Sequence, residues 1–219
     1  MNEQHTLGWF RARLGTITGS QVGRLMKKGR NSYFGDDAMS YIYQLAAERS
    51  MKSSIVDDDG EFAEYLMQVQ YSSKAMEFGT QMEAEAREAY CLERMVSCKE
   101  VGLCTHFDID DFASSPDGLI VEDDKKIALE IKCPTQAVFM RYSTEITDNE
   151  SLLSVKPEYF YQCMAHMMCT GASRTDFVVY SPWQYKPLHI VPILPDEDIF
   201  GQMEERIVKA NEIINNIIK

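Results

Sequence analysis

The sequence lacks the features of membrane, disulfide-rich and repeat proteins. No stretch of its 219 residues approaches the roughly 18 uninterrupted apolar residues of a membrane span, and the N-terminus has no signal-peptide pattern. Six cysteines occur without one C-x-x-C pair, so we expect free thiols in a reducing cytosol rather than a disulfide framework or a zinc site. With 45% hydrophobic and 26% charged residues and no internal repeat, we expect one soluble globular domain over residues 1–219.

Acidic residues are absent from one segment of an otherwise acidic chain. The net charge is −12, yet no Asp or Glu occurs between Gln4 and Gly35. The basic residues of this segment are Arg11, Arg13, Arg24, Lys27, Lys28 and Arg30. Because phosphate binding depends on local positive potential and not on global charge, this segment is a candidate nucleic-acid surface. A solvated basic helix face is the alternative interpretation.

The same segment predicts a helix, a turn and a second helix between Trp9 and Lys28. Thr18 or Ser20 is expected to be the N-cap of the second helix. Helix N-termini present unpaired amide donors and attract anions, and Arg13 just before this start could add bidentate phosphate contacts.

A polar stretch between two apolar runs predicts a β-hairpin in the middle of the chain. If its turn centres between Asp123 and Asp124, then Asp117 lies directly opposite Glu130. Directly paired side chains in an antiparallel ladder have Cβ atoms about 4.5–5.5 Å apart, and like charges there repel. A divalent cation held by both carboxylates would compensate for this repulsion.

The second strand of this hairpin alternates in character. Ile127, Leu129 and Ile131 are expected on one face, and Ala128, Glu130 and Lys132 on the other. Two carboxylates and a lysine on one face suit phosphodiester hydrolysis, which needs metal ligands and a cation near the attacking water or the scissile phosphate. Taken alone the pattern is degenerate, because a Glu and a Lys two residues apart usually mark a solvated strand face.

The remaining segments predict helices around a central set of strands. Helices are expected at residues 38–51, 73–91, 135–146, 158–169 and 195–219, strands at 98–107, 176–180 and 188–193, and loops at 29–37 and 57–60. Glu83 falls on the same helical stripe as Gly79, Ala86 and Tyr90, so it is either a satisfied structural acid or a site carboxylate. Strands in mid-chain flanked by helices predict an α/β or α+β layered domain.

Four motifs together resemble the lambda-type phage alkaline exonucleases, the YqaJ-like viral recombinase family within the RecB-like, restriction-endonuclease-like superfamily. They are Trp9-x-x-x-Arg13-Leu-Gly-x-Ile-Thr-x-Ser20, Gly79-x-Gln-x-Glu83, Ser115-Pro-Asp117-Gly-Leu with Leu129-Glu130-Ile-Lys132-Cys-Pro, and Tyr159-x-x-Gln162. Their order and spacing are similar to the family's across nearly the whole chain. The resemblance implies a restriction-endonuclease-like core with a central mixed β-sheet flanked by helices.

The resemblance also implies roles for individual residues. Asp117, Glu130 and the Ile131 carbonyl would hold Mg²⁺ or Mn²⁺, with Lys132 at the attacking water, Glu83 as an additional carboxylate and Gln162 positioning water or phosphate. Arg13, Ser20 and Ser115 match residues that cradle a terminal 5′-phosphate, and the nearby Lys28 and Arg30 are added to the DNA-binding candidates. The family pattern often carries an aromatic residue where this chain has His166, for which a satisfied structural histidine is the favoured interpretation.

The activity implied is Mg²⁺-dependent 5′→3′ digestion of one strand of duplex DNA, which leaves 3′ tails for recombination. The family implies a ring-shaped homotrimer, a single-strand annealing partner and a phage or prophage protein that acts in the bacterial cytoplasm. Two alternatives stay open: a related endonuclease or repair nuclease without 5′ polarity, and a non-catalytic module that binds DNA ends.

Overall fold

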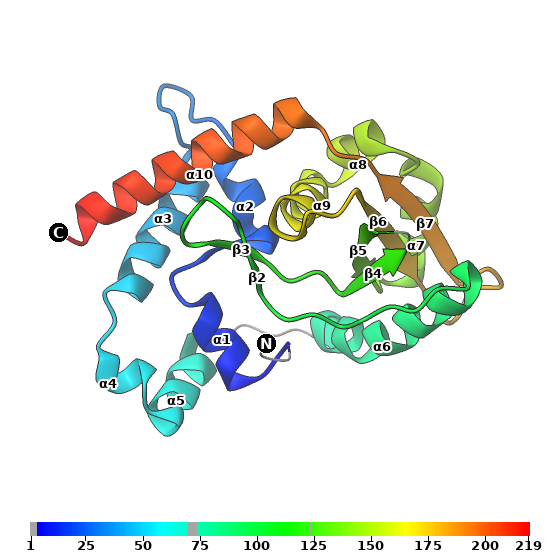
Figure 1. The fold of residues 1–219 in the computed structure, drawn as a ribbon, viewed down its shortest axis with the longest axis horizontal. Helices are drawn as coiled ribbons and strands as arrows, with labels where there is room; N and C mark the ends of the chain where they lie inside the picture. Colours follow the sequence, from blue (N-terminus) through cyan, green and yellow to red (C-terminus); the bar gives the residue numbers. More distant parts are fainter. Residues whose placement is uncertain (1–3, 70–73, 123) are drawn as a thin grey trace.

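The computed structural model describes residues 4–69, 74–122 and 124–219, which form helices around a four-stranded and a three-stranded sheet (Figure 1). The helices are α1 (Leu7–Arg13), α2 (Gly19–Leu25), α3 (Asp36–Arg49), α4 (Ser53–Val56), α5 (Asp59–Val69), α6 (Lys74–Arg94), α7 (Gln136–Glu145), α8 (Asn149–Val155), α9 (Pro157–Thr170) and α10 (Glu197–Ile217). In the described residues no helix is both long and apolar enough to cross a bilayer.

The larger sheet is mixed, with the strand order β4–β5–β6–β7. The strands are β4 (Gly118–Glu122), β5 (Lys125–Lys132), β6 (Arg174–Tyr180) and β7 (Leu188–Ile193). β5 pairs antiparallel with β4 and parallel with β6, and β6 pairs antiparallel with β7. A parallel pair needs a crossover connection, and here the chain between β5 and β6 forms α7, α8 and α9.

Helices cover both faces of this sheet, with α6 against one face and α9 against the other (Figure 1). Ile127, Leu129 and Ile131 pack with Ala86 and Tyr90 of α6, whereas Ala128 packs in the core that contains α9. The alternation expected for β5 is therefore confirmed. The face that carries Glu130 is buried beneath α9 and is not a solvated surface.

The smaller sheet lies on the other side of α9 and has the order β1–β3–β2. Its strands are β1 (Ile17–Thr18), β2 (Cys104–Thr105) and β3 (Phe112–Ser114). The chain runs from β3 into β4 through Ser115, Pro116 and Asp117, so this short connection joins the smaller sheet to the larger one. α9 contacts both sheets and also packs along α2.

Helix ends follow local capping rules. α9 begins with Pro157 in its first turn and ends at Gly171, whose positive φ of 68° suits glycine. Asp148 and Ser151 form a capping box at the start of α8. Thr18 is the N-cap residue of α2, as predicted, although its side chain makes no capping hydrogen bond. Thr18 instead shares a hydrogen bond with Ser20.

Two further predictions differ from the structure. The strand expected at residues 98–107 is reduced to β2 and an isolated bridge from Lys99 to Leu119, because the segment pairs first with the larger sheet and then with the smaller one. The loop expected at residues 57–60 is shorter, since α5 begins at Asp59. The predicted fold class, a mixed sheet flanked by helices, is confirmed.

Candidate active site

The hairpin of β4 and β5 has the register predicted from its sequence. Gly118 pairs with Leu129 and Glu122 with Lys125, which centres the turn between residues 123 and 124. Asp123 itself lies outside the described residues. The paired residues of β4 start at Gly118, directly after Asp117, and the Asp117 N–H still donates to the Leu129 carbonyl at 2.9 Å. The acidic side chain therefore stands at the end of the paired region, beside the last residues of β5.

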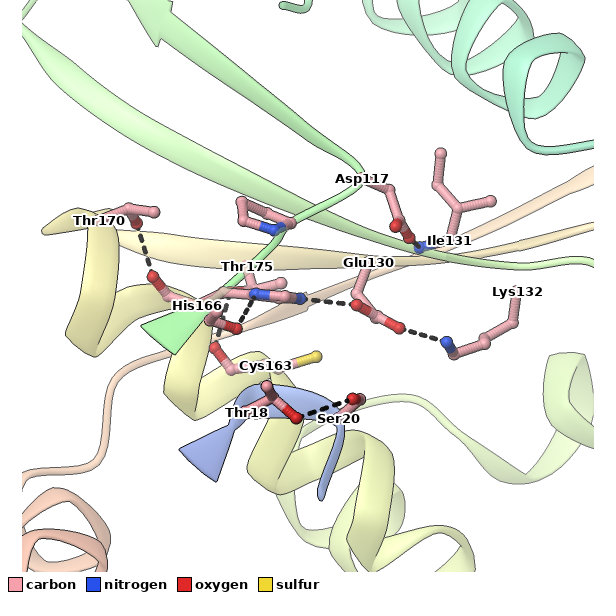
Figure 2. Close-up of polar contacts among 12 residues, drawn as sticks. Thr18, Ser20, Asp117, Glu130, Ile131, Lys132, Cys163, His166, Thr170 and Thr175 are labelled. Atoms are coloured by element: carbon pink, nitrogen blue, oxygen red, sulfur yellow. Dashed lines mark hydrogen bonds and ion pairs between the residues drawn. The ribbon is translucent and has the colours of Figure 1, made fainter. Parts of the chain in front are cut away.

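Asp117 turns its carboxylate toward the backbone of β5. Its Oδ2 accepts a hydrogen bond from the Ile131 N–H at 2.6 Å, as Figure 2 shows. Burial raises the pKa of Asp117 well above its usual value, and the neighbouring carboxylates of Glu130 and Glu83 raise it further. The Lys132 ammonium and the Ile131 amide only partly oppose this shift. The site therefore holds more acidic groups than its own cation stabilises.

Glu130 is completely buried and is held from both sides. Its Oε1 forms an ion pair with the Lys132 ammonium, and its Oε2 lies 2.6 Å from Nε2 of His166 (Figure 2). Burial opposes ionisation, but Lys132 and His166 more than offset it, so the pKa of Glu130 lies below its usual value. Within the described residues, Oε1 receives no hydrogen bond of ordinary geometry in addition to this ion pair.

Lys132 points toward the mouth of the site and stays protonated. Burial alone would lower its pKa, but Glu130 and Asp117 reverse the effect and raise the pKa above the usual value. Its Nζ also lies 4.8 Å from the centre of the Tyr159 ring, which adds a cation–π contact. Without a bound metal ion, the side chain is therefore a hydrogen-bond donor and a positive charge.

A cavity of about 450 Å³ opens at this end of β5. Its walls include Glu83 of α6, Asp117, Ile131 and Lys132 of the hairpin, Tyr142 of α7 and Tyr159 of α9. Glu83 lies 3.4 Å from Arg87, and burial followed by the charge of Glu130 raises its pKa although Arg87 and Lys132 oppose the shift. Glu83 thus both pairs with Arg87 and lines the cavity, and its role as a carboxylate of the site stays a prediction.

The donor atoms around the cavity fit a hard divalent cation. The Asp117 and Glu130 carboxylates and the Ile131 carbonyl would provide oxygen ligands, which Mg²⁺ and Mn²⁺ prefer. The crowding of acids that raises the pKa of Asp117 is the electrostatic condition that a cation relieves. Among the described residues no three His, Cys, Asp or Glu side chains already converge as a metal cluster, so water or substrate oxygens would have to complete the coordination. Magnesium usually keeps several such ligands.

A second polar group lies beside the connection that leads into Asp117. The Arg13 guanidinium stacks 4.1 Å from the centre of the Trp9 ring and donates to Ser20 Oγ at 3.3 Å. Nε1 of Trp9 in turn donates to Ser115 Oγ at 3.1 Å. Arg13, Ser20 and Ser115, which the sequence motifs grouped, therefore gather around one buried tryptophan.

Arg13 has no acidic partner in the part of the chain that the structure describes, whereas Arg11 pairs with Asp59 and Arg24 with Asp37. Burial lowers the pKa of Arg13, and Tyr41 only partly opposes this. A partly desolvated guanidinium beside hydroxyl groups, without a carboxylate, has the composition of an anion site.

Three of the predicted site residues lie outside both the acidic site and the group around Arg13. Lys28 and Arg30 are exposed in the segment between α2 and α3, which Arg206 anchors by donating to the Lys27 and Tyr33 carbonyls at 3.1 and 2.9 Å. Gln162 is half-buried on α9, one turn before His166, and no hydrogen bond of its side chain lies within the described residues. Their predicted roles stay predictions.

The sequence motifs include Trp9 but assign it no contact, they do not single out Ser114, and they do not predict that His166 lies against Glu130. The shared face of Tyr159, Gln162 and His166 on one helix was the available signal for the histidine. The contact between Trp9 and Ser115 joins residues 106 positions apart, and only the tertiary structure brings them together.

Known proteins are similar to this chain in sequence and in fold. The family described as YqaJ-like viral recombinase domain matches residues 8–173. A comparison with curated proteins found no match. The crystal structure of an alkaline exonuclease from Laribacter hongkongensis, LHK-Exo, is similar, with a TM-score of 0.77, 28% identity and coverage of 97% of this chain and 94% of that chain. The complex of LHK-Exo with dAMP matches equally well.

A phage-related exonuclease from Haemophilus somnus 129PT shares the fold, with a TM-score of 0.66, 14% identity and coverage of 93% of this chain and 95% of that chain. The family match spans most of the chain and includes Arg13, Glu83, Asp117, Glu130 and Lys132. The chain belongs to the YqaJ-like viral recombinase family.

Proposed function

We propose that the protein is a Mg²⁺-dependent 5′→3′ exonuclease that digests one strand of duplex DNA from its 5′-phosphorylated end. The family and the likeness to an alkaline exonuclease support the coarser part of this proposal, a nuclease that acts on DNA. One observation carries the finer part: two groups of side chains meet at the short connection between β3 and β4. Asp117 of this connection belongs to the acidic site with Glu130 and Lys132, and Ser115 belongs to the group around Arg13, which contains no acid.

The residues that line the cavity and the buried Glu130 beside it would have separate roles in the reaction. Asp117, Glu130 and the Ile131 carbonyl would hold the Mg²⁺, with Glu83 as an additional carboxylate, and Mn²⁺ would substitute. When bound, the ion supplies a Lewis acid for the scissile phosphate and lowers the pKa of water. Lys132, which pairs with Glu130 and lines the cavity, would orient or activate the attacking water or stabilise charge on the phosphate.

The group around Arg13 would set the direction of digestion. Arg13 would donate to the terminal 5′-phosphate, with the Ser20 and Ser115 hydroxyls as further donors, since these groups already gather without a carboxylate. A phosphate held there would lie at the entrance to the strand connection that ends at Asp117. We propose that this geometry selects phosphorylated 5′ ends and places the first phosphodiester at the acidic site, with Gln162, Lys28 and Arg30 as further contacts to water or DNA.

The proposal includes two assembly properties that derive from the family. We propose a homotrimeric ring around duplex DNA and a single-strand annealing partner that receives the 3′ tail. Light scattering in solution tests the first, because a monomer mass at micromolar concentration would contradict it.

The central test of the catalytic assignment is a paired substitution. Asp117→Asn removes a carboxylate from the cavity at almost constant volume, whereas Asp108→Asn makes the same change at an exposed residue of the loop between β2 and β3. We expect digestion of linear duplex DNA with Mg²⁺ by the parent and by Asp108→Asn, and its loss in Asp117→Asn. Equal rates for Asp117→Asn and the parent would show that the site lies elsewhere.

A further inference from the structure

His166 is a completely buried side chain whose two ring nitrogens both have polar partners. Nε2 lies 2.6 Å from Glu130 Oε2, a contact drawn in Figure 2. Nδ1 lies 2.7 Å from the Ser114 hydroxyl. Because an ionised carboxylate only accepts hydrogen bonds, Nε2 donates to Glu130. In the neutral ring Nδ1 then accepts from Ser114, which holds the tautomer that can donate to the carboxylate.

The histidine is itself held in place by the packing of three elements. It lies on α9, Ser114 lies on β3, and Gly19 at the start of α2 approaches so closely that an added Cβ would lie 2.1 Å from Ser114 Oγ. Thr170 also donates to the His166 carbonyl at 2.6 Å one turn further along α9. The ring therefore has little freedom to rotate away from Glu130.

This contact determines which oxygen of Glu130 is available to the site. Oε2 is occupied by His166, and Oε1 is turned toward Lys132, which lines the cavity. Without the imidazole, Oε2 would be a buried acceptor without a partner, and the carboxylate could rotate about its terminal torsion, which is soft for glutamate.

We propose that His166 is a positioning residue, which with Ser114 behind it orients the Glu130 carboxylate for the cation and for Lys132. The inference rests on the proposed metal-dependent nuclease and assigns no chemistry to the histidine itself. Hydrogen bonds of this kind to ligating carboxylates orient the ligand, and their removal typically costs 10- to 100-fold in metal affinity or activity.

The test is Mn²⁺ binding to the DNA-free protein, followed by electron paramagnetic resonance, together with duplex digestion at saturating metal. His166→Leu keeps the size of the side chain but removes the donor, and His166→Gln restores an N–H donor at a similar reach. We expect His166→Leu to bind Mn²⁺ about 10- to 100-fold more weakly and to lose kcat with little change in KM for DNA. His166→Gln should recover most of both.

Met167→Ala is the matched control, because Met167 is the next residue on α9, is also buried and belongs to the apolar core. It should lower the thermal unfolding temperature without changing Mn²⁺ affinity. Parent-like Mn²⁺ binding by folded His166→Leu, an equal loss in Met167→Ala, or no recovery in His166→Gln would each overturn the inference.

Two further outcomes separate this inference from the proposed function. A parent that neither binds Mn²⁺ nor digests DNA overturns both. A parent that does both while His166→Leu matches it overturns the role of His166 alone. If His166→Leu does not fold, Ser114→Ala decides by the same measurement, because it removes the partner that holds the tautomer. A reduced Mn²⁺ affinity in Ser114→Ala supports the role of His166, and an unchanged affinity overturns it.

Discussion

Replacing Arg13 by glutamine should remove the preference for phosphorylated 5′ ends and leave the hydrolytic site intact. The guanidinium is half-buried, stacks on Trp9 at 4.1 Å, contacts Ser20 at 3.3 Å and has no carboxylate partner within the described residues. It is therefore already ordered before a phosphate arrives. Glutamine can still donate one hydrogen bond but carries no charge.

The size of the effect follows from the charged hydrogen bond to phosphate that the substitution removes. Hydrogen bonds to charged groups contribute about 1.5–3 kcal/mol, and each 1.36 kcal/mol corresponds to a tenfold rate ratio. The ratio of kcat/KM for 5′-phosphorylated over 5′-hydroxyl duplexes should therefore fall by about 10- to 150-fold in Arg13→Gln. The rate on the 5′-hydroxyl duplex should change little, because that substrate lacks the group that Arg13 binds.

The assay compares two duplexes that differ only in the 5′ phosphate, with Arg11→Gln as the control. Arg11 is on the same helix, but its guanidinium forms an ion pair with Asp59 and its Nε donates to the Val56 carbonyl. Its replacement should therefore not change the kcat/KM ratio between the two duplexes. A parent-like ratio in Arg13→Gln, or an equal fall in Arg11→Gln, would refute the assignment of the phosphate site.

Three other substitutions test separate parts of the account. Because the pKa of Asp117 is raised in the folded protein, the stability that this group contributes without metal is present at acid pH and is lost as the pH rises through the folded-state pKa. Between acid and alkaline pH in EDTA, the free energy of unfolding should therefore fall less in Asp117→Asn than in the parent, as urea denaturation can measure. At alkaline pH, Mg²⁺ should stabilise only the parent. Lys132→Met should lower kcat at saturating Mg²⁺ by about 100- to 1,000-fold in single-turnover assays, and a parent-like kcat would exclude Lys132 from the reaction. Gly19→Ala should lower the free energy of unfolding by about 1–3 kcal/mol, because the added Cβ would meet Ser114. Gly201→Ala should raise it by about 0.5–1 kcal/mol, because Gly201 is an exposed residue of α10 with open space around it. Similar values for the two variants would contradict the close packing at Gly19.

The hairpin was predictable because its information is local. The register of β4 and β5 follows from a polar turn of even length between two apolar runs, so Asp117, Glu130 and Lys132 could be brought together within 16 residues of sequence. The alternation in β5 is likewise predicted by the sequence pattern, because Ile127, Leu129 and Ile131 recur at every second position and so share one face.

The contacts that complete the site are long-range and were not predictable from periodicity. His166 reaches Glu130 because the crossover between two parallel strands lays α9 on the sheet. Trp9 reaches Ser115 because β1 pairs with β3, a parallel pair separated by most of the first half of the chain. Both depend on sheet order and helix docking, which a pattern of residue types in one segment does not encode. The resemblance to a family was needed to group Arg13 with Ser115.

The most direct test of the central claim is digestion of a 5′-phosphorylated linear duplex that carries a label at either the 5′ or the 3′ end of one strand, with Mg²⁺ or with EDTA. We predict rapid release of labelled mononucleotide from the 5′ label, late release from the 3′ label, and no release in EDTA. Earlier release from the 3′ label, internal cuts as the first products, or unchanged digestion in EDTA would contradict a Mg²⁺-dependent 5′→3′ exonuclease.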